Sequence, residues 1–409
     1  MRVSRDTLTY WRGKLGRIAG GPCTCKKSEE ETRILEETLS TYAAGTKRYA
    51  TFDFPLFKDS VSKFVKSLKH TEQAFLYSAS CNSPTMYSNA FAILTLAGLG
   101  VDLQPASSRW KESLDKYQCE EDGLFRDPCI NNSLFEQNDW WGARHFALIA
   151  TAAYDAIGST PKYPFRFANA FTSESAVSQL IQDTDWSMNG DDDNKLMNVG
   201  GLLQYSRDRL QNTNAKNAVS LLLQLLIDRI NPSTGLWGEA DLDEPSERSR
   251  AVQFAYHLYC LLIYDNQKLP YPEPLIDSVL ATQNELGGFA PRRNSSACED
   301  IDSVHLLAAA TRQTNYRSDE IKDALRHFLC WVFANQNTDG GFVFRRQDAF
   351  VYGHPQMSSR ANESHLFATW FRCLSIALAF EATSPKTNPF HLHKSPGYYC
   401  GFSGGAHEC

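Results

Sequence analysis

Two short segments, QNELGGF at 283–289 and QNTDGGF at 336–342, decide the fold. Each joins an amide side chain to a glycine pair and an aromatic residue, and the two are one period of 53 residues apart. NPSTGLW ends one period earlier, at Trp237, and QCEEDGLF ends at Phe125. The spacing predicts a degenerate copy near position 181, which QDTDW supplies at Trp186, and a last copy near 395, within HLHKSPGYYCGF. Six repeats of about fifty residues follow.

The segments between these turns have helical periodicity. RAVQFAYHLYCLLIYD and IKDALRHFLCWVFANQ are two examples, and each repeat has room for two such helices. A glycine after the second helix is the usual terminator, because glycine adopts the left-handed conformation at low cost. The sequence therefore predicts an all-α protein with a single (α/α)6 toroid, an inner ring of six helices inside an outer one, and almost no strand.

Domain boundaries follow from the extent of the repeats. We expect the toroid to occupy residues 66–400, with an N-terminal arm or lid over 1–65 and a flexible tail over 401–409. The first thirty residues contain no signal-like apolar run, and no stretch approaches 18 consecutive apolar residues. These observations predict a cytoplasmic protein without an integral membrane segment. The oligomeric state is left open.

Composition excludes several classes. Of 409 residues, 42% are hydrophobic, which is enough for a large core, and the net charge is −6. With carboxylates in excess, a basic face for nucleic acid is not expected. Eleven cysteines, an odd number, include a single CxC pair at Cys23 and Cys25, which is weak evidence for zinc.

Every turn leads to the start of an inner helix, so the segments after the turns are expected to gather at one rim of the central cavity. These segments carry carboxylates and paired arginines. The candidates are Asp191, Asp192, Asp193, Glu239, Asp241, Asp243, Glu299, Asp300, Asp302 and His305, with Arg292, Arg293, Arg345 and Arg346. Carboxylates can hold Mg²⁺ and arginines can bind phosphate oxygens, although both residue types are also common as helix caps and solvated loops.

The glutamine-aromatic turns resemble those of the terpenoid cyclase and protein prenyltransferase superfamily over about residues 70–400. CEDIDSVH at 298–305 is similar to the aspartate motif of proton-initiated terpene cyclases. In that alignment Asp300 matches the first aspartate and Asp302 the proton donor, whereas Ser303 replaces the last aspartate. His305, one turn further on, could orient Asp302. In size and architecture the chain also looks like atypical fungal sesquiterpene cyclases of the humulene-synthase kind.

The resemblance implies a terpene cyclase of secondary metabolism that ionises an allylic prenyl diphosphate, farnesyl diphosphate above all. Mg²⁺ would be held by Asp191, Asp192, Asp193 and Asp300. The four arginines would bind the diphosphate, and Trp141, Phe254 and Trp370 would line the cavity and stabilise cations. Asp302 acting as a Brønsted acid, with Asp300 and His305, is a variant of this hypothesis.

Two alternatives remain open. A carbohydrate-active hydrolase or lyase would use Asp300, Asp302 or Glu363 as acid or base, with Trp140, Trp141 and Trp370 stacking on sugar rings. A non-catalytic helical-repeat module would use the acidic mouth to bind a basic partner.

Overall fold

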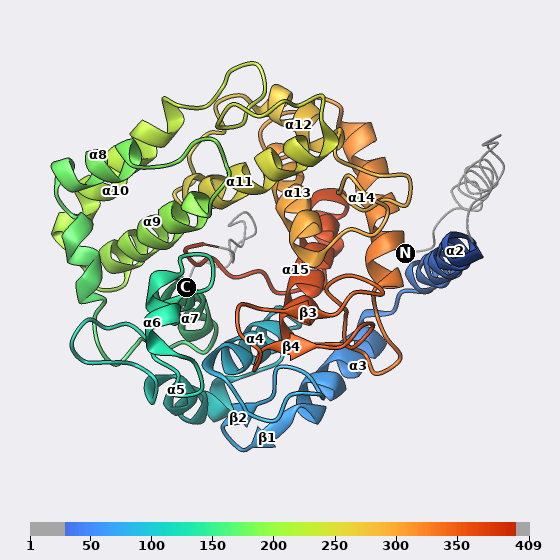
Figure 1. Cartoon of the computed structure of the whole chain (residues 1–409), viewed down its shortest axis with the longest axis horizontal. Helices are drawn as coiled ribbons and strands as arrows, with labels where there is room; N and C mark the ends of the chain where they lie inside the picture. Colours follow the sequence, from blue (N-terminus) through green and yellow to red (C-terminus); the bar gives the residue numbers. More distant parts are fainter. Residues whose placement is uncertain (1–28, 398–409) are drawn as a thin grey trace.

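The structure, a computed structural model, describes residues 29–397, and six of its helices form a closed inner ring (Figure 1). Each inner helix packs against the next, and the last packs back against the first. The ring consists of α4 (Met86–Gly98), α7 (Ala143–Ala156), α9 (Asp192–Asp208), α11 (Pro245–Tyr264), α13 (Ala297–Ala310) and α15 (Leu366–Thr383).

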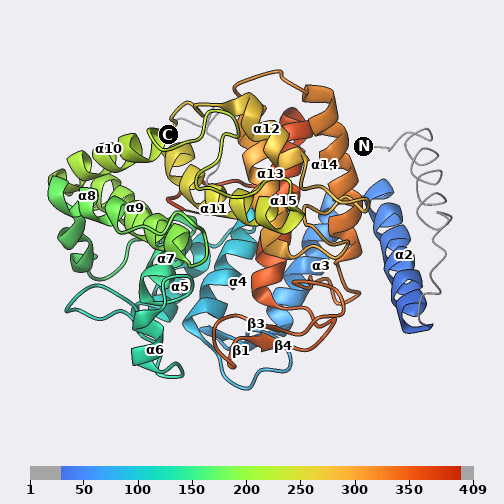
Figure 2. The same cartoon turned by 45° about the horizontal axis from the view of Figure 1, so that its top comes forward.

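Each inner helix is preceded in the chain by a helix of an outer ring (Figure 2). The outer helices are α3 (Phe54–Ser67), α5 (Ser107–Asp115), α8 (Glu174–Gln182), α10 (Thr213–Ile227), α12 (Pro272–Leu280) and α14 (Ser318–Ala334). The chain is therefore an (α/α)6 toroid, as the repeat predicted. The described residues also contain α2 (Glu29–Ala50), α6 (Asn132–Gln137) and the short 3-10 helices η1 (Gln104–Ala106), η2 (Arg166–Phe171) and η3 (Pro385–Thr387).

Strand is confined to two small antiparallel hairpins in the described part of the chain. β1 (Lys69–Thr71) pairs with β2 (Ala74–Phe75), and β3 (Phe350–Val351) pairs with β4 (Ser358–Ser359), Phe350 opposite Ser359. Both hairpins lie between an outer helix and the inner helix that follows it.

Inner helices are buried over most of their length because they are covered on both sides. Every residue from Met86 to Ala97 in α4 is buried, and so is all of α13 except Cys298. α15 is long and apolar enough to cross a membrane, but 83% of it is buried as a wall of the ring. Outer helices are amphipathic instead: α14 exposes Asp319, Glu320 and Asp323. The cytoplasmic location stays a prediction.

The repeat signature works as a clasp between neighbouring units. The Gln283 amide donates to the carbonyl of Gly287 (2.9 Å) and to that of Ala324 on the next outer helix (2.8 Å). Gly287 has φ +94°, and a side chain there would collide with the His327 backbone. Gln118 and Gln336 bond the glycine of their own turns in the same way. Glutamine and glycine thus recur because each turn must close on itself and on its neighbour.

The sixth turn precedes the others rather than following them. Phe75 pairs with Lys69 across the β1–β2 hairpin, as Phe289 pairs with Gln283 in a glycine turn. The copy expected near position 395 is therefore wrong; that region follows the last inner helix and crosses α4, where the His391 amide donates to the Gly98 carbonyl.

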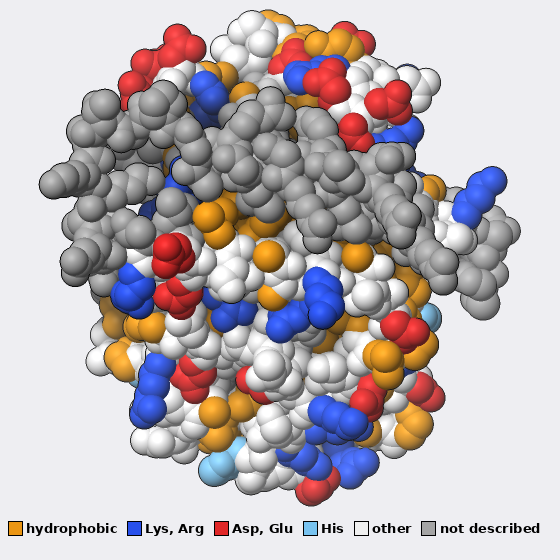
Figure 3. Space-filling model, turned by 90° about the vertical axis from the view of Figure 1, so that its right-hand side faces the viewer, with side chains coloured by type: hydrophobic (Ala, Val, Ile, Leu, Met, Phe, Trp, Pro, Cys, Tyr) orange, Lys and Arg blue, Asp and Glu red, His pale blue; other side chains and the backbone are white. Residues whose placement is uncertain are grey.

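The N-terminal segment is divided between two places. α3, which ends at Ser67, belongs to the outer ring although most of it lies within residues 1–65. α2 packs along the outer side of α14, away from the ring's centre (Figure 1). On the described part of this face of the molecule, basic and acidic side chains are interspersed (Figure 3). The tail expected at 401–409 lies outside the described residues.

Candidate functional site

A cavity of about 290 Å³ lies in the centre of the inner ring. The inner helices α7, α9, α11, α13 and α15 line it mainly with residues near their N-termini, the end to which the turns lead. Its volume is near the lower end of the usual range for small-molecule sites, roughly 300–1,000 Å³. The lining residues are Trp140, His145, Asn194, Arg250, Gln253, His257, Cys298, Asp302, Phe344, Phe350, Tyr352, Phe367 and Phe371.

The β3–β4 hairpin supplies part of the wall. It brings Tyr352 against Phe367 and Trp140, with ring centroids 4.4 and 5.5 Å apart. Gly353 follows with φ +71°, and its Cα faces the Trp141 indole so closely that a Cβ would overlap the ring. Glycine is therefore required for the hairpin to seat Tyr352 in the cavity.

Asp302 is the acidic side chain of the cavity wall. It projects from the second turn of α13 and is only 2% exposed. No hydrogen bond or ion pair joins its carboxyl group to another residue between 29 and 397. Burial, together with the nearby charges of Asp193 and Glu299, raises the pKa of Asp302 well above its ordinary value. The surroundings of Asp302 therefore favour the protonated form of its carboxyl group.

Asp193 has the opposite environment. Its carboxylate accepts two hydrogen bonds from Arg250 (2.8 and 3.1 Å) and one contact from His257 Nδ1 (2.8 Å). Burial alone would raise the pKa of Asp193, but His257 and Arg250 outweigh it and hold the pKa below its ordinary value. Asp193 is therefore ionised, and it orients the His257 ring in the cavity wall.

Two other titratable groups of the wall are uncharged at neutral pH. Burial and the neighbouring His257 lower the pKa of His145 to about 3. Burial, with Asp302 and Glu299 close by, raises the pKa of the Cys298 thiol. Desolvation, the first cause in each case, disfavours whichever form carries charge.

The expected metal ligands do not converge. Asp191 accepts a hydrogen bond from the Trp140 amide (3.2 Å), Asp192 accepts one from the Asp185 amide (2.5 Å), and Asp193 pairs as described above. Within residues 29–397, no group of three or more His, Cys, Asp or Glu side chains is arranged to hold a metal ion. The grouping of Asp191, Asp192, Asp193 and Asp300 at one site is therefore wrong.

Asp300 lies in the wall between inner helices and not in the cavity. It forms a buried ion pair with Arg372 of α15 and accepts hydrogen bonds from the Phe289 amide and the Ser295 hydroxyl, each at 2.9 Å. These contacts tie the turn at 283–289 to α13 and α15. The role is structural.

The four arginines are spread outside the cavity and do not form a diphosphate site. Arg292 is exposed, and Arg293 pairs with Glu285. Arg345 pairs with Glu299 at 2.9 Å. Arg346 bonds the carbonyls of Ala334 and Gln336 at the end of α14.

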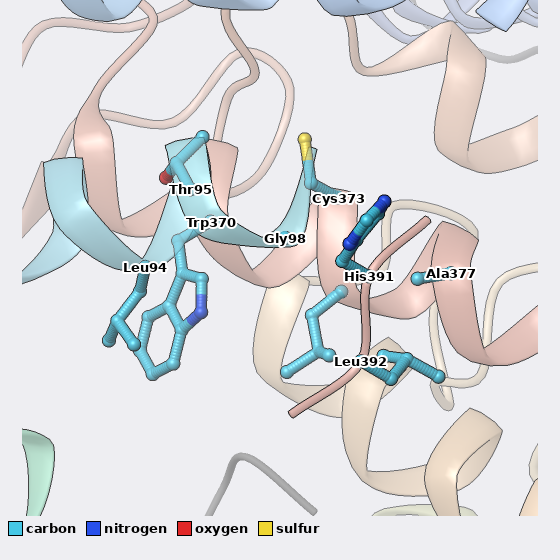
Figure 4. A pocket seen from close by; sticks show the side chains of 9 residues that line it. Leu94, Thr95, Gly98, Trp370, Cys373, Ala377, His391 and Leu392 are labelled. Carbon is cyan, nitrogen blue, oxygen red and sulfur yellow. The ribbon is translucent and has the colours of Figure 1, made fainter. Parts of the chain in front are cut away.

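The other candidates do not line the cavity. The His305 ring packs against Tyr256 (5.5 Å), and Glu363 accepts from the Ser80 amide and hydroxyl in a loop. Trp141 and Phe254 are buried away from the cavity. Trp370 faces a crevice between α4 and α15, closed by His391 and Leu392, with room for about one water molecule (Figure 4).

Sequence reasoning missed Arg250, His257, His145 and Tyr352. A signal for two of them was present: Arg250, Gln253 and His257 stand at i, i+3 and i+7 on a helix that is otherwise apolar from Ala251 onward, which places polar groups on one face. Nothing in the sequence distinguishes Tyr352 from other loop aromatics.

Comparison with known proteins gives structural matches with low identity and TM-scores below 0.5. No family model matches the chain, and no curated protein does. A polysaccharide lyase matches with TM-score 0.46 and 10% identity, over 82% of this chain and 98% of that one. A glycosyl hydrolase of family 88 from Bacteroides vulgatus gives 0.44 and 11%, over 83% and 97%. A protein from Actinoplanes gives 0.42 and 10%, over 81% and 100%.

These findings correct the family suggested by the sequence. The two matches whose activity is named are carbohydrate enzymes, not terpenoid cyclases. The residues on which the resemblance was based make structural contacts here. The glutamine turns join neighbouring repeats, and Asp300 pairs with Arg372. The arginine pairs lie outside the cavity. The prediction of a terpene cyclase acting on farnesyl diphosphate, and the likeness to humulene-type enzymes, are wrong. The expectation of Mg²⁺ as a cofactor stays a prediction.

Proposed function

We propose that the chain is an enzyme that cleaves a glycosidic bond, with Asp302 as the general acid. The observation that carries this proposal is the Asp302 carboxyl group, buried, without a partner among the described residues and facing a cavity of ligand size. Breaking a glycosidic bond leaves negative charge on an oxygen, and a positioned carboxylic acid removes it by donating a proton.

Two further features of the cavity support a saccharide ligand. Trp140, Phe344, Phe350, Phe367 and Phe371 offer aromatic faces. Asn194, Gln253 and Tyr352 offer amide and hydroxyl groups that can bond sugar hydroxyls. Small-molecule sites commonly combine an apolar wall with a few such polar groups.

His257 is the basic group of the same wall. Asp193 binds its Nδ1, so the tautomer with a proton on Nδ1 is favoured and Nε2 is the basic atom. In hydrolysis Asp302 protonates the leaving oxygen as the C–O bond breaks, water adds to the anomeric carbon, and His257 accepts the proton that water loses. In elimination His257 would instead take a proton from carbon.

The test is a screen of purified protein against oligosaccharides of varied linkage, with mass spectrometry of the products. Cleavage that adds water, or leaves an unsaturated sugar, supports the proposal. Asp302→Asn is expected to lower kcat by about 10²–10⁴-fold, the usual contribution of a general acid. Asp243→Asn, which changes an exposed rim carboxylate, is the matched control and should retain activity. Full activity of Asp302→Asn would refute the assignment.

A further inference from the structure

We infer that the cavity binds a neutral sugar ring rather than a uronic acid, because no uncommitted cation faces it among the described residues. This inference rests on the proposed function and names its substrate class. It also selects between the two reactions left open above.

Arg250 is the permanent cation among the lining residues, and its hydrogen bonds are directed to protein. Nε donates to the Met188 carbonyl (3.2 Å), and Nη2 donates to the Gly190 carbonyl (2.9 Å). Nη1 and Nη2 together hold both oxygens of Asp193. A bidentate grip on a substrate carboxylate would require Arg250 to release Asp193, which would then be buried without its partner.

The other basic groups add little positive charge to the cavity. His145 is neutral at neutral pH, since burial lowers its pKa to about 3. His257 is positive only when protonated, and its Nδ1 then faces the same Asp193 carboxylate. Along the loop from Phe344, the next cation is Arg345, which is committed to Glu299.

Asp302 supplies no positive charge to an anion in either protonation state. Protonated, it contributes no positive charge; ionised, it repels a carboxylate in a cavity of low dielectric constant. By contrast, Asn194, Gln253 and the Tyr352 hydroxyl can bond the hydroxyl groups of a neutral ring without any charge balance.

The absence of a uronate carboxylate decides the reaction. Elimination removes a proton from the carbon beside a carboxylate, and the enzyme must neutralise that carboxylate to make the proton acidic. A neutral sugar has no such acidic C–H. The reaction assigned to this cavity is therefore hydrolysis: water adds to the anomeric carbon, and the leaving oxygen receives the Asp302 proton.

The experiment compares each neutral oligosaccharide with the counterpart oxidised at C6 to the uronic acid. For the wild type we expect kcat/KM to be about tenfold or more higher for the neutral member, because placing a charge beside an uncompensated carboxyl group is costly. Gln253→Lys adds an ammonium group to the wall and should shift this ratio toward the uronic acid. Gln253→Met, of similar length and uncharged, removes the amide without adding charge, so it should lower kcat/KM for both members of a pair without reversing the preference.

Preference of the wild type for the uronic member, or an unsaturated product, would overturn the inference while the proposed function stood. For pairs that are cleaved too slowly to measure, titration calorimetry compares the binding of the two members. If the full chain neither cleaves nor binds either member of any pair, the proposed function fails, and the inference fails with it.

Discussion

Asp300 and Asp302 are two residues apart on α13, yet they lie in two different regions of the molecule. Asp300 faces the wall between inner helices and is saturated by Arg372, Ser295 and the Phe289 amide. Asp302 faces the cavity and has no partner among residues 29–397. Successive helical positions diverge by about 100°, so two steps turn a side chain to a different face. The same residue type stabilises the fold in one region and offers a proton in the other.

The largest expected effect on stability separates these two regions. Asp300→Ala leaves the Arg372 guanidinium buried without its counter-charge, which typically costs about 3–5 kcal/mol. Asp302→Ala removes an unpartnered buried polar group, so its free energy of unfolding should equal or exceed that of the wild type. Urea titration of both variants checks the contrast. Equal losses in the two variants would show that the regions are not distinct; Asp300→Asn, which keeps a hydrogen-bond acceptor, serves if Asp300→Ala does not fold.

The pH dependence of stability should separate Asp302 from the ion-paired Asp193. The pKa of Asp193 is lowered by folding, so its stabilising contribution is present above about pH 4, the ordinary value, and disappears as the pH falls below it. The pKa of Asp302 is raised, so the folded state keeps a proton that the unfolded chain loses above about pH 4, and stability falls as pH rises.

The variants Asp193→Asn and Asp302→Asn test this opposition. Relative to the wild type, Asp302→Asn should gain stability as the pH increases from about 4, with a slope of at most about 1.4 kcal/mol per pH unit. Asp193→Asn should be less stable than the wild type at neutral pH, and this difference in the free energy of unfolding should disappear as the pH falls below about 4. Chemical unfolding at a series of pH values measures both slopes, and slopes of the same sign would contradict the assignment.

A smaller loss of stability is expected when one of the glutamine clasps between neighbouring repeats is removed. Gln283→Ala leaves the Gly287 and Ala324 carbonyls without their amide donor, at a cost of about 1–3 kcal/mol. Because the clasp is remote from the cavity residues, kcat should remain near that of the wild type. Differential scanning calorimetry and a rate measurement on one sample check both points. A large loss of kcat without loss of stability would show that the clasp contributes to catalysis.

The smallest effect is expected at the arginines outside the cavity. Arg293 is 42% exposed in its side chain, and its pair with Glu285 should contribute less than about 1 kcal/mol. Arg293→Ala should alter neither stability nor kcat/KM appreciably. A strong loss of substrate binding in this variant would show that the arginines outside the cavity take part in substrate binding.

The sequence allowed the ring to be predicted because each clasp repeats the same contacts at the same spacing. It misled at the first turn, since the β1–β2 hairpin replaces the glycine pair with paired strands and does not show the pattern. The aspartate motif placed Asp300 and Asp302 together among the candidates, but only Asp300 has an ion-pair partner among the described residues, and that partner, Arg372, comes from α15. Repeat spacing shows where a helix starts, and only the packed ring shows which face meets the cavity.

The most direct test of Asp302 as general acid compares two leaving groups. A sugar leaving group needs a proton as the glycosidic bond breaks, whereas a nitrophenolate leaves without one. With oligosaccharides Asp302→Asn should therefore lose about 10²–10⁴-fold in kcat, and with nitrophenyl glycosides of the same sugar it should keep most of the wild-type rate. Equal losses with both leaving groups, or no loss with oligosaccharides, would contradict the role assigned to Asp302.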